Sequence, residues 1–202
     1  MKLRLLAVAA VVALQLSAQS NAAKPARVLL QSGVYQLTET NLIELSKPLT
    51  GESRDRVVRV FAFARPLTEL EWANWSARGA VNHGYLPLNA YLVEIPVNAR
   101  SAWAFVAELP LQGAAPFSGS MKLSNTLANG EFPEYAWVGS EVELVVVPLA
   151  NASRTALSAN LDRIGTVVAT GAHGISVRIN PSDLQRVAAL PEVQFVQPKE
   201  AP

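Results

Sequence analysis

A regular succession of strand and helix patterns across residues 141–198 constrains the fold of this chain more than any other feature of its sequence. In residues 141–147 the side chains alternate with a period of two, which is typical of a strand with one buried face. Three further stretches have strand character, at residues 166–170, 175–179 and 193–196. Two stretches with helical spacing of apolar residues separate them, so the order is strand, helix, strand, strand, helix, strand. This βαββαβ order predicts one antiparallel sheet with two helices on one face.

Capping residues locate the ends of these two helices. Asn151 or Ser153 can cap the first helix, and Gly165 follows it where a helix end requires a positive φ. The second helix begins after Asn180, with Pro181 at its first position. Both helices therefore have boundaries that the sequence specifies locally.

Residues 57–123 repeat the same succession of patterns. A capping box, Thr68 to Glu71, opens their first helix. The corresponding landmarks agree in order and chemistry: Gly79 with Gly165, Ile95 with Ile179, Asn98 (a predicted helix cap) with Asn180, and Leu109-Pro110 with Leu190-Pro191. Side-chain identity is otherwise low, so a chance succession of patterns is the alternative to duplication. We favour duplication because the landmarks keep their order.

This repeat defines the predicted domain organisation. An α+β chain is expected, with a lead-in segment and two tandem modules joined by a linker that contains Asn129-Gly130 and Pro133. The predicted segments are a signal peptide at 1–22, a lead-in at 23–55, module 1 at 56–124, a linker at 125–139 and module 2 at 140–202. A strand at Arg27–Gln31 is the one element expected in the lead-in.

The first residues have the pattern of a cleavable signal peptide. Lys2 and Arg4 precede an apolar run, Leu5–Leu16, and Ser20-Asn-Ala22 supplies small residues for cleavage after Ala22. An uncleaved anchor or lipidated tail is the alternative, although the chain has no cysteine to carry a lipid. We expect a secreted or periplasmic protein that has no membrane association once the signal is removed.

Charge and composition narrow the possible partners. Without Lys2 and Arg4, the 17 basic residues fall to 15 against 16 acidic ones, which gives no electrostatic reason to expect a nucleic-acid partner. Half of the residues are hydrophobic and none is cysteine, so the cores must be stable through packing alone.

The sequence offers no recognisable catalytic constellation. His83 and His173 each lie beside a glycine in a predicted turn or strand end, where a histidine is usually a solvated polar residue. Neither has an acidic neighbour at metal-ligand spacing, and no glycine-rich phosphate loop is present. We therefore expect no cofactor and no enzymatic activity, with an enzyme of unrecognised site as the remaining alternative.

Two stretches carry a family resemblance. Residues 78–123 contain Arg-Gly-Ala-Val, Tyr-Leu-Pro-Leu-Asn-Ala-Tyr-Leu-Val, Leu-Pro, Pro-Phe and Lys-Leu, and residues 164–198 contain Ile-Gly-Thr-Val, Ile-Ser-Val-Arg-Ile and Leu-Gln-Arg-Val-Ala-Ala-Leu-Pro-Glu-Val-Gln-Phe-Val-Gln-Pro. Both resemble the propeptide region of exported subtilisin-like serine proteases, a subset of which carries two inhibitor-type modules in tandem. The resemblance implies ferredoxin-like modules whose sheet packs on the protease, assists its folding and then blocks its active site.

In such modules the segment after the last strand lies in the substrate cleft. Here the resemblance assigns partner binding to Val196, Gln197, Pro198, Lys199 and Glu200. We expect residues 196–202 to be extended and exposed, with no core strand beyond Val196. Such a tail would bind as an added, substrate-like strand.

The aspartate, histidine and serine motifs of subtilases do not occur in this chain. The protein is therefore expected to be a free-standing inhibitor-like protein or the front part of a protease precursor, acting on a subtilisin-like serine protease in trans or in cis. The rival hypothesis is a structural or interaction module of the cell envelope with no protease partner, because fold alone does not decide function.

Overall fold

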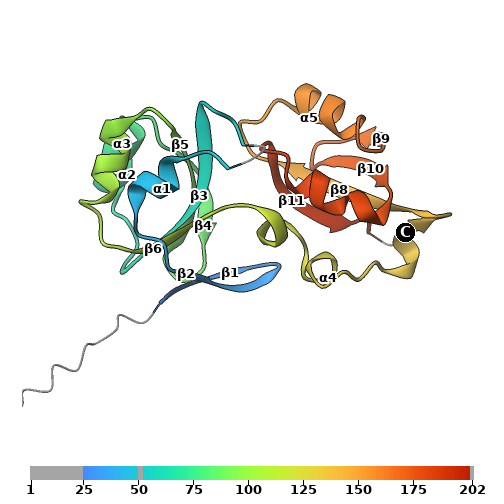
Figure 1. Cartoon of the computed structure of the whole chain (residues 1–202), viewed down its shortest axis with the longest axis horizontal. Helices are drawn as coiled ribbons and strands as arrows, with labels where there is room; N and C mark the ends of the chain where they lie inside the picture. Colours follow the sequence, from blue (N-terminus) through green and yellow to red (C-terminus); the bar gives the residue numbers. More distant parts are fainter. Residues whose placement is uncertain (1–24, 50–51, 201–202) are drawn as a thin grey trace, which may run out of the picture.

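The computed structural model describes residues 25–49 and 52–200, which form two antiparallel sheets, each with helices against it, and a two-stranded hairpin (Figure 1). The mixed α/β class and the antiparallel sheets confirm that part of the prediction. The predicted signal peptide at 1–22 lies outside the described residues. Within the described part of the chain, no helix has the length and apolar character needed to span a bilayer.

The first sheet contains four antiparallel strands in the order β4-β5-β3-β6. Its elements in chain order are β3 (Arg56–Phe63), α2 (Glu69–Ser76), β4 (Val81–Leu86), β5 (Ala90–Pro96), α3 (Arg100–Val106) and β6 (Leu111–Pro116). The capping box at α2 is confirmed, since the Thr68 hydroxyl accepts from the Glu71 N–H and the Glu71 carboxylate accepts from the Thr68 N–H. The predicted cap at Asn98 is wrong: Ala99 is the cap residue of α3, and it makes no side-chain hydrogen bond.

The second sheet repeats that order as β11-β8-β10-β9 and adds β7 beside β8 as a fifth strand. Its elements are β7 (Trp137–Val138), β8 (Glu141–Pro148), α5 (Arg154–Leu161), β9 (Thr166–Thr170), β10 (Ile175–Ile179), α6 (Leu184–Ala188) and β11 (Val193–Pro198). Ser153 caps α5, and Asn180 caps a short 3₁₀ turn that leads into α6. Between the sheets, the segment predicted to be a linker carries α4 (Asn125–Ala128) as well as β7.

The two sheets also share their irregularities. Gln112 on β6 and Gln194 on β11 are each bulged out of the pairing with the first strand of their sheet. On the opposite edges, His83 on β4 and Val168 on β9 are bulged in the same way. Because bulges are specific local features of a strand pair, these matches show that strand order and register agree in both sheets.

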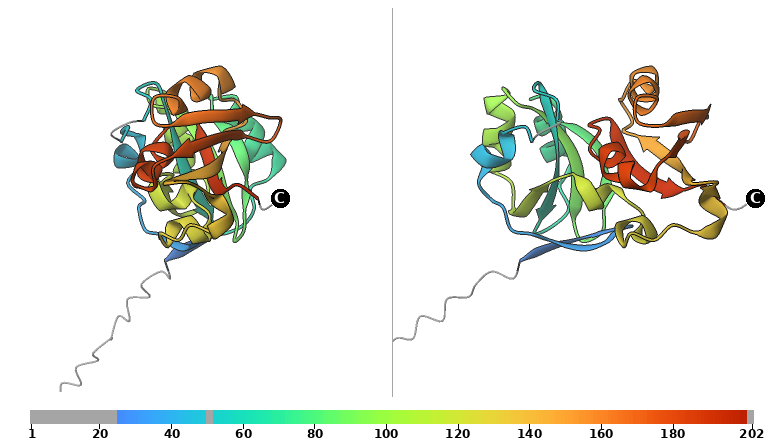
Figure 2. Two further views of the ribbon diagram at one scale, coloured as in Figure 1. Left: turned by 90° about the vertical axis from the view of Figure 1, so that its right-hand side faces the viewer. Right: turned by 45° about the vertical axis from the view of Figure 1, so that its right-hand side comes forward.

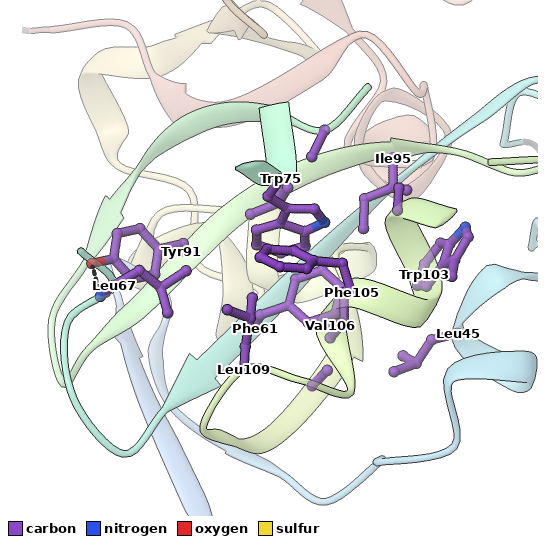
Figure 3. Close-up of a cluster of buried hydrophobic side chains, with 14 of the residues drawn as sticks. Leu45, Phe61, Leu67, Trp75, Tyr91, Ile95, Trp103, Phe105, Val106 and Leu109 are labelled. Atoms are coloured by element: carbon purple, nitrogen blue, oxygen red, sulfur yellow. Dashed lines mark hydrogen bonds between the residues drawn. The ribbon is translucent and has the colours of Figure 1, made fainter. Parts of the chain in front are cut away.

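The helices cover one face of each sheet, and the two cores differ in character. In the first, Trp75 of α2 packs against Phe61 of β3 with ring centroids 5.4 Å apart in an edge-to-face arrangement (Figure 3). The second is aliphatic, and its fully buried members include Leu144, Val146, Leu157, Leu161, Ile175, Val177, Ile179 and Val187. The shared fold is therefore filled in two chemically different ways.

The lead-in segment covers the other face of the first sheet. Its hairpin, β1 (Ala26–Leu30) and β2 (Gly33–Leu37), contributes to a buried cluster whose sheet residues are Val60, Ala62, Ala90 and Leu92. The sequence predicted β1 but not β2. A short helix, α1 (Leu42–Ser46), then places Leu45 in the aromatic core. Gly113 permits the close crossing of β2 over β6, because a Cβ there would lie 2.1 Å from the Leu37 carbonyl oxygen.

Gly165 has a different role from the one predicted. Its φ lies outside the left-handed region, whereas Gly79 has a φ of +99° after α2. A Cβ at Gly165 would lie 2.2 Å from the carbonyl oxygen of Arg178. Close approach of two strands therefore requires this glycine, and the predicted positive φ is wrong.

Candidate functional site

The residues predicted to bind a partner begin inside the sheet. Val196 is fully buried, and Gln197 and Pro198 pair with Val145 and Leu144 as part of β11. The expectation that no strand continues beyond Val196 is therefore wrong. Since β8 is eight residues long, it provides pairing partners for two more residues of the last strand.

Lys199, the residue after β11, is also bound to the second sheet. The Lys199 N–H donates to the Glu143 carbonyl at 3.0 Å, and Lys199 Nζ lies 2.8 Å from the Glu143 carboxylate. Arg178 lies 3.4 Å from the same carboxylate. The hydrogen bond from Lys199, assisted by Arg178, lowers the pKa of Glu143. Glu200 is the first residue of the predicted tail that is free of the sheet, and both Lys199 and Glu200 are exposed. Residues 201–202 of the predicted tail lie outside the described residues.

The strand β7 determines where the chain leaves the sheet. Val142 of β8 pairs with Ile179 of β10 and also with Trp137 of β7, so β7 lies on the edge of β8 opposite β10. That edge is the one that β11 occupies. The two strands therefore follow each other along β8, and the chain cannot continue along this edge beyond Lys199. In Figures 1 and 2 the end of β11 lies beside the segment that leads into β8.

The face of the second sheet opposite its helices is only partly covered in the described chain, and we call it the open face. Val145, Val147 and Phe195 are half-buried and belong to none of the buried clusters. The ion pairs of Glu143 with Arg178 and Lys199 lie beside them. This face mixes apolar and charged side chains, which is common in surfaces that bind other proteins.

A groove continues from this face toward the first sheet. Its volume is about 690 Å³, and apolar side chains from both halves of the molecule line it. Leu30 of the hairpin, Leu86 of β4 and Phe195 of β11 are among them. The open face and the groove therefore form one continuous surface that reaches both sheets.

A buried carboxylate on β5 connects the two halves. The Glu94 carboxylate lies 2.8 Å from His83 Nε2 and accepts a hydrogen bond from the Asn151 amide at 2.8 Å, and it also contacts the Arg56 guanidinium. The hydrogen bond from His83 is the main cause that lowers the pKa of Glu94 to about 2, with Asn151 and Arg56 contributing. Glu94 therefore stays ionised and joins β5 to the loop after β8.

The prediction that His83 is a solvated turn residue is wrong, because its side chain is 0% exposed. Its bulged position on β4 directs it toward Glu94, which lies eleven residues away in the sequence and is adjacent only through strand pairing. His173, in contrast, is exposed in the bend before β10. The spacing of His83 and Glu94 in the sequence therefore did not predict their contact.

Lys122 is a second buried charge at the junction of the halves. Its ammonium donates to the Leu190 carbonyl oxygen at 2.8 Å, and burial lowers its pKa to about 8 while Glu52 and Glu192 oppose the shift. A cavity of about 240 Å³ lies beside it, lined in part by Arg56 and Glu94. Among residues 25–49 and 52–200, no three histidine, cysteine or acidic side chains group in a way that could hold a metal ion. The buried charges at the junction make polar contacts between the halves.

Comparisons of this chain with protein-family models, with curated proteins and with solved structures find no match.

Proposed function

We propose that this chain is an exported, non-catalytic pair of ferredoxin-like propeptide modules that assists the folding of a subtilisin-like serine protease, inhibits it, or does both. The partner is either a separate protease or a catalytic domain that follows in the same precursor. The family in this proposal rests on the resemblance of residues 78–123 and 164–198 to protease propeptides.

The duplicated sheets support the tandem arrangement. In each of them the first strand of the unit lies in the centre, between the last and the third. This is the order expected of a βαββαβ module, and the bulges at Gln112 and Gln194 fall in corresponding strands. We place the modules at residues 56–124 and 140–202, with residues 125–139 between them.

The observation that carries the proposal is the asymmetry between the two sheets. The hairpin buries the free face of the first sheet, while the corresponding face of the second is only half-buried and ends where the chain leaves β11. A protease that received the tail would therefore also meet the open face of the second sheet. Two adjacent contacts of this kind suit a protein partner better than a small ligand.

The test is inhibition of purified secreted subtilisin-type proteases by the Ala23–Pro202 protein. The intact protein should bind about 100-fold more tightly than a Val196–Pro202 peptide, because the sheet removes part of the cost of ordering the tail. Removing Glu200–Pro202 should weaken inhibition without unfolding the protein, since β11 ends at Pro198.

Refolding provides the second readout. The intact protein should raise the yield of active protease recovered from denaturant. If it neither inhibits nor assists refolding across a panel of secreted subtilases, the protease function is wrong and the cell-envelope hypothesis becomes the better account.

A further inference from the structure

Three large apolar side chains near β7 are exposed. Tyr135 is 53% exposed, Trp137 42% and Val138 41%. They lie within four consecutive residues, and we call these three residues the β7 patch. The Trp137 indole is fixed by its N–H, which donates to the Phe132 carbonyl at 3.4 Å, and by an edge-to-face contact with the Phe132 ring. A fixed and exposed cluster of this kind is typical of a binding site.

The β7 patch lies where the chain leaves the second sheet. Trp137 pairs with Val142, and Lys199 bonds to Glu143, the next residue of β8, along the same edge. A chain advances at most about 3.6 Å per residue, so the residues just after Lys199 stay within about 10 Å of that point. Any protein that holds those residues must also approach the patch.

We propose that the β7 patch is a docking surface for the rim of the substrate cleft of the protease that receives residues 200–202. This inference rests on the proposed function and adds a contact outside the tail itself. Aromatic side chains that are exposed in the free protein and become buried in an interface often contribute most of the binding energy. In the described residues, no strand of the first sheet corresponds to β7. This surface is therefore present on the second sheet alone.

Charges around the patch indicate the chemistry of the partner. Glu131, Glu134 and Glu200 are exposed near it, while Lys199 is paired with Glu143. An acidic border favours an apolar partner surface flanked by basic side chains. Association should therefore slow as salt is added, because exposed charges act mainly on the rate of encounter.

The experiment compares the full chain with a Tyr135→Ser/Val138→Ser variant. Both are titrated against a secreted subtilisin-type protease in its inactive form, with the catalytic serine replaced by alanine. The dissociation constant should rise about 10-fold to 100-fold in the variant. Leu70→Ser is the matched control, since Leu70 is 72% exposed on α2 of the other half, and it should change the constant less than 2-fold. Thermal unfolding of each variant checks that the fold is kept.

Hydrogen exchange of the wild-type complex gives an independent readout. The amides of residues 132–138 should gain protection when the inactive protease binds. If the wild type binds but the variant binds equally well and these amides stay unprotected, the patch inference is wrong while the proposed function stands. If the wild type does not bind, both are wrong. If the wild type is a dimer in solution that the variant converts to a monomer, the patch is a self-association surface and the inference is overturned.

Discussion

The two sheets have the same strand order and register, yet they present different surfaces. On the first, Val60 and Leu92 lie under the hairpin and are buried. Val145 and Ser176 form the corresponding pair of the second sheet, and they are only half-buried. The same backbone thus supports a closed unit and an open one. The two units differ in whether the hairpin packs on the face away from the helices.

The helix side of each sheet shows a second contrast. Aromatic rings fill the first core and branched aliphatic side chains fill the second, although the strands pair in the same register. Packing can therefore change its chemistry while the fold is kept, provided that the total volume is filled. The differences between the halves on which the proposed function rests lie on the opposite face.

The largest effect should come from the aromatic core. Trp75→Ala should cost about 3–5 kcal/mol of the free energy of unfolding, because it removes a fully buried ring among other rings. Leu161→Ala in the aliphatic core should cost about 2–5 kcal/mol. Chemical denaturation of both variants measures these losses. Trp75→Phe is the control and should cost less, since the buried indole N–H of Trp75 has no hydrogen-bond partner among the described residues. Equal losses from both tryptophan variants would argue against a tightly packed aromatic core.

A second prediction concerns a variant that should uncover the first sheet, so that it resembles the second. Gly113→Ala should cost about 1–3 kcal/mol, because the new methyl group would collide with the backbone of β2 and push the hairpin away from β6. Faster amide exchange in residues 26–37, with little change in residues 175–179, would report an uncovered first sheet. An unchanged hairpin would show that the close contact at Gly113 does not hold it.

The third prediction compares two buried glutamates by pH. Glu94 has a folded pKa of about 2, below its ordinary value of 4.5, so its contribution to stability is present above pH 4.5 and is lost as the pH falls toward 2. Glu94→Gln should therefore cost about 1–3 kcal/mol at pH 7 and almost nothing near pH 2. Unfolding curves at several pH values measure the difference.

Glu143→Gln in the second sheet is the matched comparison. The side chains of its partners Arg178 and Lys199 are 31% and 52% exposed, so the loss at pH 7 should be about 1 kcal/mol or less. The loss should also fade as the pH drops, because the pKa of Glu143 is lowered in the same direction. A larger loss for Glu143 than for Glu94 would contradict the expectation that Glu94 gains more because its partner His83 is fully buried.

Local patterns predicted what local chemistry decides. The alternation in residues 141–147 and the caps at Thr68 and Asn180 identified elements that the structure contains. The sequence did not predict β2, which lies in a polar stretch without a convincing period, or β7, which is only two residues long. It also missed the contact between His83 and Glu94, which depends on pairing between two strands.

The candidate site was predictable only in part. The resemblance pointed to residues 196–200, and these do lie at the end of the last strand. How far that strand continues depends on the length of β8, and where the chain departs depends on β7. Both are properties of the partner strands, so the local sequence of the tail could not show them.

The hairpin over the first sheet has a consequence for how the molecule is made. Residues 26–37 are synthesised before the surface that they cover, which includes Leu92 and Phe117. The hairpin must therefore wait for these residues, while the second sheet and its helices form from one continuous stretch, residues 137–198. Contacts between distant residues form slowly because a long loop must close first. When the whole chain refolds, the half that carries the hairpin should thus be the later one to reach its final packing.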